Sequence, residues 1–169
     1  MLDLTWITDD LAIGGCIPPA HIAALAQERV AAVVDLRGEA CDDPQLLARH
    51  RIELLHLPTI DLAAVSPVML QRGVAFVTGH LAAGRRVLAH CTHGIGRSAL
   101  LVLCVLVERG HAPIDALELA KQRRGRVSPS PAQYEAWAGW LAARQRETRA
   151  TWRVPTFDEF KAIAYRHLP

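Results

Sequence analysis

The sequence contains almost no lysine and carries little net charge. Lys121 and Lys161 are the only lysines, and the 19 basic residues stand against 17 acidic ones, which leaves a formal net charge of +2. A charge this balanced does not demand a nucleic-acid partner, and none is expected. Because 51% of the residues are hydrophobic, the composition is typical of a globular protein rather than a disordered one.

Paired cysteines and long hydrophobic runs are also missing. The four cysteines include no CxxC pair, which argues against a zinc site, and no metal or other cofactor is expected. The longest apolar run, 99–107, has nine residues and is too short to span a bilayer. The first ten residues contain neither the basic nor the apolar region of a signal peptide, so we expect a cytoplasmic protein. The length of 169 residues suits one domain with a sizeable core, and nothing in the sequence indicates an oligomeric state.

Strand and helix patterns alternate along the chain. Apolar and β-branched runs predict strands at 30–36, 52–57 and 86–90, after two short strands within 2–15. Helices are expected at 19–28, 44–51, 66–83, 97–109, 113–124 and 131–146. This alternation predicts an α/β fold, a three-layer sandwich whose central, largely parallel sheet of about four or five strands is flanked by helices. We expect one main domain at 1–146 and a C-terminal tail at 147–169, with one helix docked on the domain.

The stretch VLAHCTHGIGRS, residues 87–98, combines the end of a buried strand, a cysteine, a loop with two glycines and the start of an apolar helix. Cys91 would lie beneath the helix N-terminus, where N–H groups converge and the helix dipole is positive. Such a setting lowers a thiol pKa from about 8.5 to roughly 3.5–7.5, which predicts a thiolate nucleophile. Arg97 can reach back with a guanidinium fork that matches two phosphate oxygens.

Acidic residues follow two other predicted strands. Ligands of parallel sheets bind at the carboxyl ends of the strands, and Glu39, Asp61 and Cys91 each come directly after one. We therefore expect the three side chains to meet at one rim. Asp61 is the candidate general acid, with a turn-capping aspartate as the alternative. Its rival, Asp35, lies inside a hydrophobic strand, where a structural role fits better.

The segment HCTHGIGRS matches the signature H-C-x-x-G-x-x-R-S/T, and the chain therefore resembles the cysteine-dependent protein tyrosine phosphatase superfamily. The segments VVDLRGE, LPTID and VSPSPAQYEAW come in the order and spacing of its dual-specificity branch, so the resemblance covers roughly residues 5–145. It implies a phosphatase acting on phosphate monoesters without a metal or other cofactor. His93 departs from that branch, where this position is commonly small.

The resemblance also implies a role for each residue of the site. Cys91 would attack phosphorus and form a phosphocysteine, while Arg97 and the loop N–H groups hold the phosphate oxygens. Asp61 would protonate the leaving oxygen and then activate water, and the Ser98 hydroxyl would help to expel the sulfur. The residues expected to bind phosphate are Thr92, His93, Gly94, Ile95, Gly96 and Arg97.

Four neighbouring residues are open to interpretation. Gln133 resembles a glutamine that orients the attacking water, or is an ordinary helix-surface residue. Glu39 either fixes the Arg97 fork or is a solvated loop charge, and His90 is expected to brace the loop by hydrogen bonds. A reversible disulfide between Cys41 and Cys91, protecting the nucleophile from oxidation, is a further hypothesis.

The expected substrate is a phosphorylated protein. No long insertion deepens the site for phosphotyrosine alone, so phosphoserine and phosphothreonine should also enter. The loop has no lysine of the kind found in phosphatases of highly charged inositides, and the basic run 121–126 is interpreted as a helix end. The alternatives are the same chemistry on a phospholipid head group, an RNA 5′ end or a small molecule, and a non-catalytic phosphate-binding module.

Overall fold

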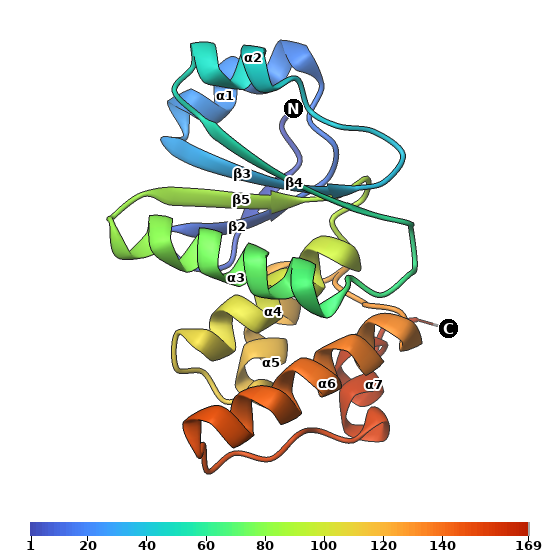
Figure 1. Ribbon diagram of the computed structural model, residues 1–169. Helices are drawn as coiled ribbons and strands as arrows, with labels where there is room; N and C mark the ends of the chain where they lie inside the picture. Colours follow the sequence, from blue (N-terminus) through green and yellow to red (C-terminus); the bar gives the residue numbers. More distant parts are fainter. Residues whose placement is uncertain (169) are drawn as a thin grey trace.

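The computed structural model describes residues 1–168 and contains a five-stranded sheet with helices on both faces (Figure 1). The strands are β1 (Leu4–Trp6), β2 (Leu11–Gly14), β3 (Val30–Arg37), β4 (Glu53–Thr59) and β5 (Arg86–His90). Their order across the sheet is β1-β2-β5-β3-β4, and only the β1–β2 pair is antiparallel among the described residues. The predicted α/β sandwich with a largely parallel sheet is confirmed.

Helices cover the two faces unequally, as Figure 1 shows. One face carries the short 3-10 helix η1 (Pro19–His21) with α1 (Ile22–Gln27) and α2 (Pro44–Arg49). The other carries α3 (Pro67–Ala82), α4 (Arg97–Glu108), α5 (Pro113–Arg123), α6 (Pro131–Thr148) and α7 (Phe157–Ala164). All residues of α4 from Arg97 to Val107 are buried, so α4 is the central helix of the larger core.

The expected end of the fourth strand before Pro58 is wrong, because β4 continues to Thr59. β4 is an edge strand, where a proline without an N–H group leaves no ladder hydrogen bond unmade. The additional length places the Thr59 carbonyl against Arg97, whose Nη1 donates to it over 2.8 Å.

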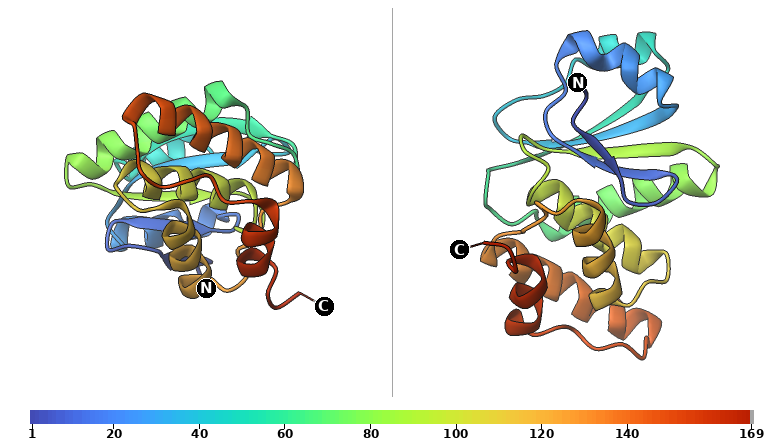
Figure 2. Two further views of the ribbon diagram at one scale, coloured as in Figure 1. Left: turned by 90° about the horizontal axis from the view of Figure 1, so that it is seen from below. Right: turned by 180° about the vertical axis from the view of Figure 1, so that it is seen from behind.

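The C-terminal residues pack against the preceding helices. α6 runs to Thr148, slightly beyond the predicted end at residue 146, and α7 is the helix expected in the tail. Figure 2 shows α7 beside α5. The Phe160 ring is fully buried, and its centroid lies 6.1 Å from that of Trp137. Residues of the predicted tail therefore contribute to the larger core.

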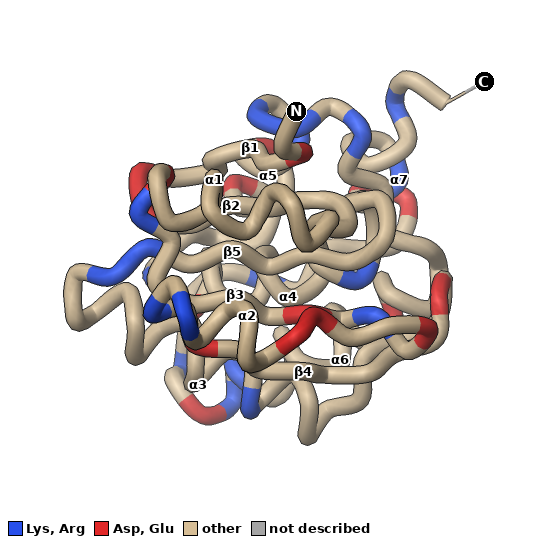
Figure 3. The backbone as a smooth tube through the Cα atoms, turned by 90° about the horizontal axis from the view of Figure 1, so that it is seen from above, with Lys and Arg blue, Asp and Glu red and all other residues tan. Residues whose placement is uncertain are grey.

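Charged positions of both signs are spread along the backbone in Figure 3. Within residues 1–168, no helix has both the length and the apolar character needed to cross a membrane. Two residues of the basic run at the end of α5 are not solvated: Lys121 and Arg124 are 2% and 5% exposed.

Candidate active site

The ends of β3, β4 and β5 bring Glu39, Asp61 and Cys91 around Arg97, the first residue of α4. Arg97 donates from Nη1 to Glu39 Oε2 (2.7 Å) and from Nη2 to Glu39 Oε1 (2.8 Å). Asp61 Oδ1 lies 3.3 Å from Arg97 Nη2. The three strand ends therefore meet at one rim, as their parallel arrangement predicts.

The Cys91 thiol lies at the bottom of the loop and is 3% exposed. Its Sγ is 3.4 Å from Ser98 Oγ, which belongs to the first turn of α4. Burial alone would raise the pKa of Cys91, but hydrogen bonds from the Ser98 hydroxyl and from the N–H groups of Ser98, Gly94 and His93 outweigh it. The pKa therefore lies below that of an ordinary cysteine, which favours the nucleophilic thiolate.

Donors for an anion remain free beside the sulfur. Among the described residues, the buried Nε of Arg97 has no hydrogen-bond partner, although both terminal nitrogens are paired. Gly96 caps α4 without a side-chain hydrogen bond, so no side chain covers the N-terminus of the helix. Buried donors are nearly always paired, and a phosphate oxygen is the partner that suits a cationic N–H at a helix N-terminus.

Glu39 fixes the Arg97 fork, which settles the two interpretations of this residue. Its carboxylate accepts hydrogen bonds from both terminal nitrogens of Arg97 and from the Thr92 hydroxyl. The hydrogen bond from Arg97 is the main cause that holds the pKa of Glu39 far below its usual value. The Thr92 side chain, expected to bind phosphate, thus contacts Glu39 in this structure.

Asp61 lies on an open loop, and its side chain is 60% exposed. Besides facing Arg97, its Oδ1 accepts the Leu62 N–H over 3.0 Å, and Leu62 has a positive φ of 63°. The carboxylate therefore both closes a turn and stands at the rim above Arg97. Its position allows a proton transfer to a leaving group that extends from the loop towards solvent.

Gln133 is buried, so its interpretation as a helix-surface residue is wrong. It forms a capping box with Ser130 at the start of α6, and its Nε2 donates to the Ala63 carbonyl over 3.2 Å. The Ser130 hydroxyl donates to Leu62 O over 2.6 Å. A Cβ atom added to Gly96 would lie 3.1 Å from Gln133 Nε2. Gln133 thus contacts both the loop that carries Asp61 and the loop that follows Cys91.

His90 braces the loop from below, as expected. Its Nε2 is 2.6 Å from Asp42 Oδ2 and its Nδ1 is 3.4 Å from the Cys91 carbonyl. Asp35 is fully buried, and its carboxylate accepts a hydrogen bond from the Arg37 guanidinium. Burial alone would raise the pKa of Asp35, but the side-chain and backbone hydrogen bonds from Arg37 and the nearby positive charges together outweigh it, so the pKa is lowered. Asp35 therefore has the structural role that its strand position indicates.

Two groups of side chains within residues 1–168 lie close enough to hold a metal ion. These groups are Asp35, Asp42 and His90, and Asp35, Cys41 and His56. Arg37 Nη2 already lies 2.8 Å from a carboxylate oxygen of both Asp35 and Asp42. The guanidinium thus supplies the positive charge that these carboxylates require.

Cys41 is exposed and free, with its Sγ 3.3 Å from the Asp42 carbonyl. Burial and the nearby carboxylates of Asp35 and Asp42 raise the pKa of Cys41, so a smaller fraction of Cys41 than of Cys91 is thiolate at neutral pH. The disulfide between Cys41 and Cys91 stays a prediction.

The sequence prediction assigns Arg124 only to a helix end and misses its role in the site. Its buried side chain donates to the carbonyl oxygens of His93 and Gly94 in the loop. An arginine at a helix end normally faces solvent, so no local signal distinguishes this one.

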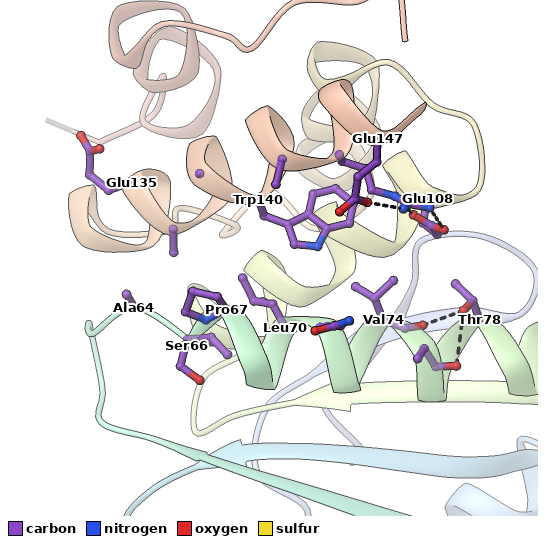
Figure 4. A pocket seen from close by; sticks show the side chains of 17 residues that line it. Ala64, Ser66, Pro67, Leu70, Val74, Thr78, Glu108, Glu135, Trp140 and Glu147 are labelled. Atoms are coloured by element: carbon purple, nitrogen blue, oxygen red, sulfur yellow. Dashed lines mark hydrogen bonds and ion pairs between the residues drawn. The ribbon is translucent and has the colours of Figure 1, made fainter. Parts of the chain in front are cut away.

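A separate groove of about 770 Å³ runs between α3 and α6 (Figure 4). Leu70, Val74 and Trp140 face it, and at one end Glu108 and Glu147 hold Arg144. The groove includes residues 64–67 of the segment after Asp61, but no residue of 91–97.

The sequence from 16 to 140 matches the family model described as dual specificity phosphatase, catalytic domain. The chain belongs to the dual specificity phosphatase family. This dual specificity phosphatase is therefore a cysteine-dependent phosphatase and a hydrolase, consistent with Cys91 and Arg97 at the two ends of its loop.

Two curated relatives and one solved structure illustrate the similarity. The mouse "Phosphatidylglycerophosphatase and protein-tyrosine phosphatase 1" is 27% identical over 136 residues, which are 75% of this chain and 70% of the relative. The human "Dual specificity protein phosphatase 2" is 29% identical over 122 residues, 71% of this chain but 38% of the relative. The crystal structure of PTPMT1 in complex with PI(5)P shares the fold, with a TM-score of 0.80 and 23% identity over 86% of this chain and 98% of that one.

Proposed function

We propose that this dual specificity phosphatase hydrolyses phosphotyrosine and phosphoserine or phosphothreonine in proteins through a phosphocysteine on Cys91. The observation that carries the proposal is the juxtaposition of two groups. A thiol with a lowered pKa lies in the same loop as a buried arginine, Arg97, whose Nε–H is free. Together they suit attack on a phosphorus atom whose oxygens are held by N–H donors.

In the first step, the Cys91 thiolate attacks phosphorus while the bond between phosphorus and the ester oxygen breaks. Asp61 gives its proton to that oxygen, so the product leaves as an alcohol or phenol. The equatorial phosphate oxygens bind the Arg97 Nε–H and the N–H groups of the loop. Their charge is present throughout the transfer, and these donors are fixed before the substrate arrives.

In the second step, a water molecule attacks the phosphocysteine and gives a proton to the Asp61 carboxylate. The bond between sulfur and phosphorus breaks, and Cys91 leaves as a thiolate. The Ser98 hydroxyl, 3.4 Å from the sulfur, stabilises the charge that returns to it. Inorganic phosphate then departs.

A protein substrate suits the open rim of the site. The carboxylates of Glu39 and Asp61 are 47% and 60% exposed, so a phosphorylated side chain on another protein can approach them without a deep channel. One of the relatives is named dual specificity protein phosphatase 2, and this name supports a protein substrate.

The test is phosphate release from an aryl phosphate and from phosphotyrosine and phosphoserine peptides. Cys91→Ser and Arg97→Ala should each abolish release, whereas Cys16→Ser, which removes an exposed free cysteine, should leave it unchanged. Turnover that survives in Cys91→Ser would contradict the mechanism. A wild-type protein that binds phosphate but releases none from any substrate would support a non-catalytic binding module.

A phospholipid head group is the second candidate, favoured by one surface feature. Ile60, Leu62 and Val68 are 77%, 68% and 66% exposed, and Ile60 and Leu62 flank Asp61. Exposed apolar side chains that lie together mark a site of association with protein or membrane, and Ile60 and Leu62 share the loop that carries Asp61. Two relatives named for phosphatidylglycerophosphate phosphatase activity align with 75% and 74% of this chain.

The two substrate classes are separated by one pair of substitutions. Ile60→Ser with Val68→Ser should lower the rate on vesicles that contain phosphatidylglycerophosphate if the lipid surface docks there, and leave an aryl phosphate unaffected. Phosphopeptide hydrolysis that exceeds lipid hydrolysis in the wild type favours the protein substrate. The reverse order favours the lipid.

A further inference from the structure

Arg124 reaches the phosphate-binding loop from the opposite side to the substrate. It follows the last residue of α5 and is 5% exposed. Its Nε donates to Gly94 O over 2.9 Å and its Nη2 to His93 O over 3.0 Å. One guanidinium therefore holds two successive carbonyl groups of the loop.

The direction of these carbonyls determines the direction of the neighbouring N–H groups. In a trans peptide, the C=O of one residue and the N–H of the next point in opposite directions, and no described peptide is cis. Because Arg124 holds the carbonyls of His93 and Gly94, the N–H groups of Gly94 and Ile95 point away from Arg124. The Gly94 N–H is one of the donors that lower the pKa of Cys91.

Asp3 holds Arg124 in place. Its Oδ1 accepts from Nη1 and its Oδ2 from Nη2, each over 2.9 Å, and Thr5 Oγ1 accepts from Nη1 over 3.0 Å. The hydrogen bond from Arg124 is the main cause that lowers the pKa of Asp3. Asp3 precedes β1 and lies outside residues 16–140, so a residue beyond the matched family region supports the loop.

Two glycines leave room for this contact. Gly94 has a φ of 62°, and a Cβ atom there would lie 2.6 Å from Arg124 Nη2 and 2.6 Å from the Gly14 carbonyl. A Cβ atom on Gly15 would meet an Asp3 carboxylate oxygen. The absence of a side chain at Gly94 and Gly15 thus leaves the space that the Asp3–Arg124 ion pair occupies.

We propose that Asp3 and Arg124 form a clamp, and that Arg124 is a positioning residue that fixes the inward direction of the Gly94 and Ile95 N–H groups. The clamp sets both the affinity of the loop for phosphate and the fraction of Cys91 present as thiolate. This inference rests on the proposed function of the loop as the phosphate site.

The experiment compares Arg124→Lys, Arg124→Met and Asp3→Asn with the wild type. Arg124→Lys keeps the charge but loses the fork, which separates orientation from electrostatic attraction. Arg126→Met is the matched control, because Arg126 is 53% exposed and its Nη1 is 3.8 Å from the same Asp3 carboxylate. The first readout is the pH dependence of Cys91 alkylation by iodoacetamide, monitored by mass spectrometry. The others are the inhibition constant of inorganic phosphate and the kcat and KM for an aryl phosphate.

Both Arg124 variants should raise the pKa of Cys91, weaken inhibition by phosphate and lower kcat by up to roughly a hundredfold, the loss that a small misplacement of a catalytic group can cause. Asp3→Asn should change the same quantities in the same direction, to a smaller extent. Arg126→Met should behave as the wild type. Asp3 is partly exposed, so its variant provides the same test if an Arg124 variant does not fold.

A wild-type pKa of Cys91 in Arg124→Lys would overturn the proposal, since charge alone would then be sufficient. A lowered thermal midpoint with an unchanged alkylation profile would also overturn it, since the ion pair would then be only structural. Alkylation does not require turnover. A wild-type protein with a reactive Cys91 but no phosphate release would therefore contradict the proposed function and leave the clamp testable.

Discussion

Replacing Ser98 by alanine should raise the pKa of the Cys91 thiol. The Ser98 hydroxyl is fully buried, lies 3.4 Å from Cys91 Sγ and is the strongest of the hydrogen bonds that oppose the effect of burial on this pKa. The variant keeps the backbone N–H of residue 98, which also lowers the pKa, so only part of the stabilisation is removed. The change isolates one contact of the proposed thiolate.

The size of the shift follows from the strength of such a contact. A hydrogen bond to a charged group contributes about 1.5–3 kcal/mol, and one pKa unit corresponds to about 1.4 kcal/mol. The expected rise is therefore about one to two units. Because the thiolate is the reactive form, the acid limb of the rate profile moves to higher pH, and the rate below the original pKa falls roughly tenfold to a hundredfold.

The assay is the rate of Cys91 alkylation as a function of pH, which avoids the ionisation of a phosphate substrate. The matched control is Thr78→Ala, which removes a hydroxyl that donates to Val74 O within α3, outside the loop. A second consequence concerns turnover. Phosphocysteine should accumulate in Ser98→Ala, because sulfur leaves less easily, and appear as a burst of the aryl product. An alkylation profile identical to that of the wild type would refute the reasoning.

Three other predictions follow from the same geometry. Asp61→Asn should lower kcat/KM, which reports the first step, by roughly 10²–10⁴-fold on phosphoserine peptides and less on an aryl phosphate, whose leaving group needs no proton; equal losses of kcat/KM on both substrates would contradict its role as the acid. Gly96→Ala should destabilise the fold by about 1–3 kcal/mol because its Cβ meets the Gln133 amide. Gln133→Ala in the same chain should recover part of the lost stability in thermal unfolding, and no recovery would contradict the contact. Phe160→Ala should lower the free energy of unfolding by about 3–5 kcal/mol in urea titrations, since the ring is fully buried in the larger core, and a loss below about 1 kcal/mol would show that α7 is not part of it.

The rim of the site was predictable because it depends on two local patterns. Apolar runs identify the strands, and the carboxyl ends of parallel strands lie together, which placed Glu39, Asp61 and Cys91 at one edge. The loop signature then supplied Arg97 and Ser98. None of these predictions required the contacts between distant helices.

Other parts of the site depend on information that the local sequence does not contain. Arg124 and Asp3 are 121 positions apart, and each looks like a solvated charge beside a helix or strand end. Gln133 has the spacing of a capping residue, but its burial depends on how α6 meets the segment 61–66. The continuation of β4 through Pro58 depends on β4 being an edge strand, which only the order of the whole sheet determines.

The most direct test of the account is to trap the covalent intermediate. Wild-type protein and Ser98→Ala are mixed with a phosphotyrosine peptide, quenched in acid within the first turnover and digested for mass spectrometry. The account predicts one phosphoryl group on the peptide that contains Cys91, at higher occupancy in Ser98→Ala. Phosphate release without any phosphorylated Cys91, or a phosphoryl group on another residue, would contradict it.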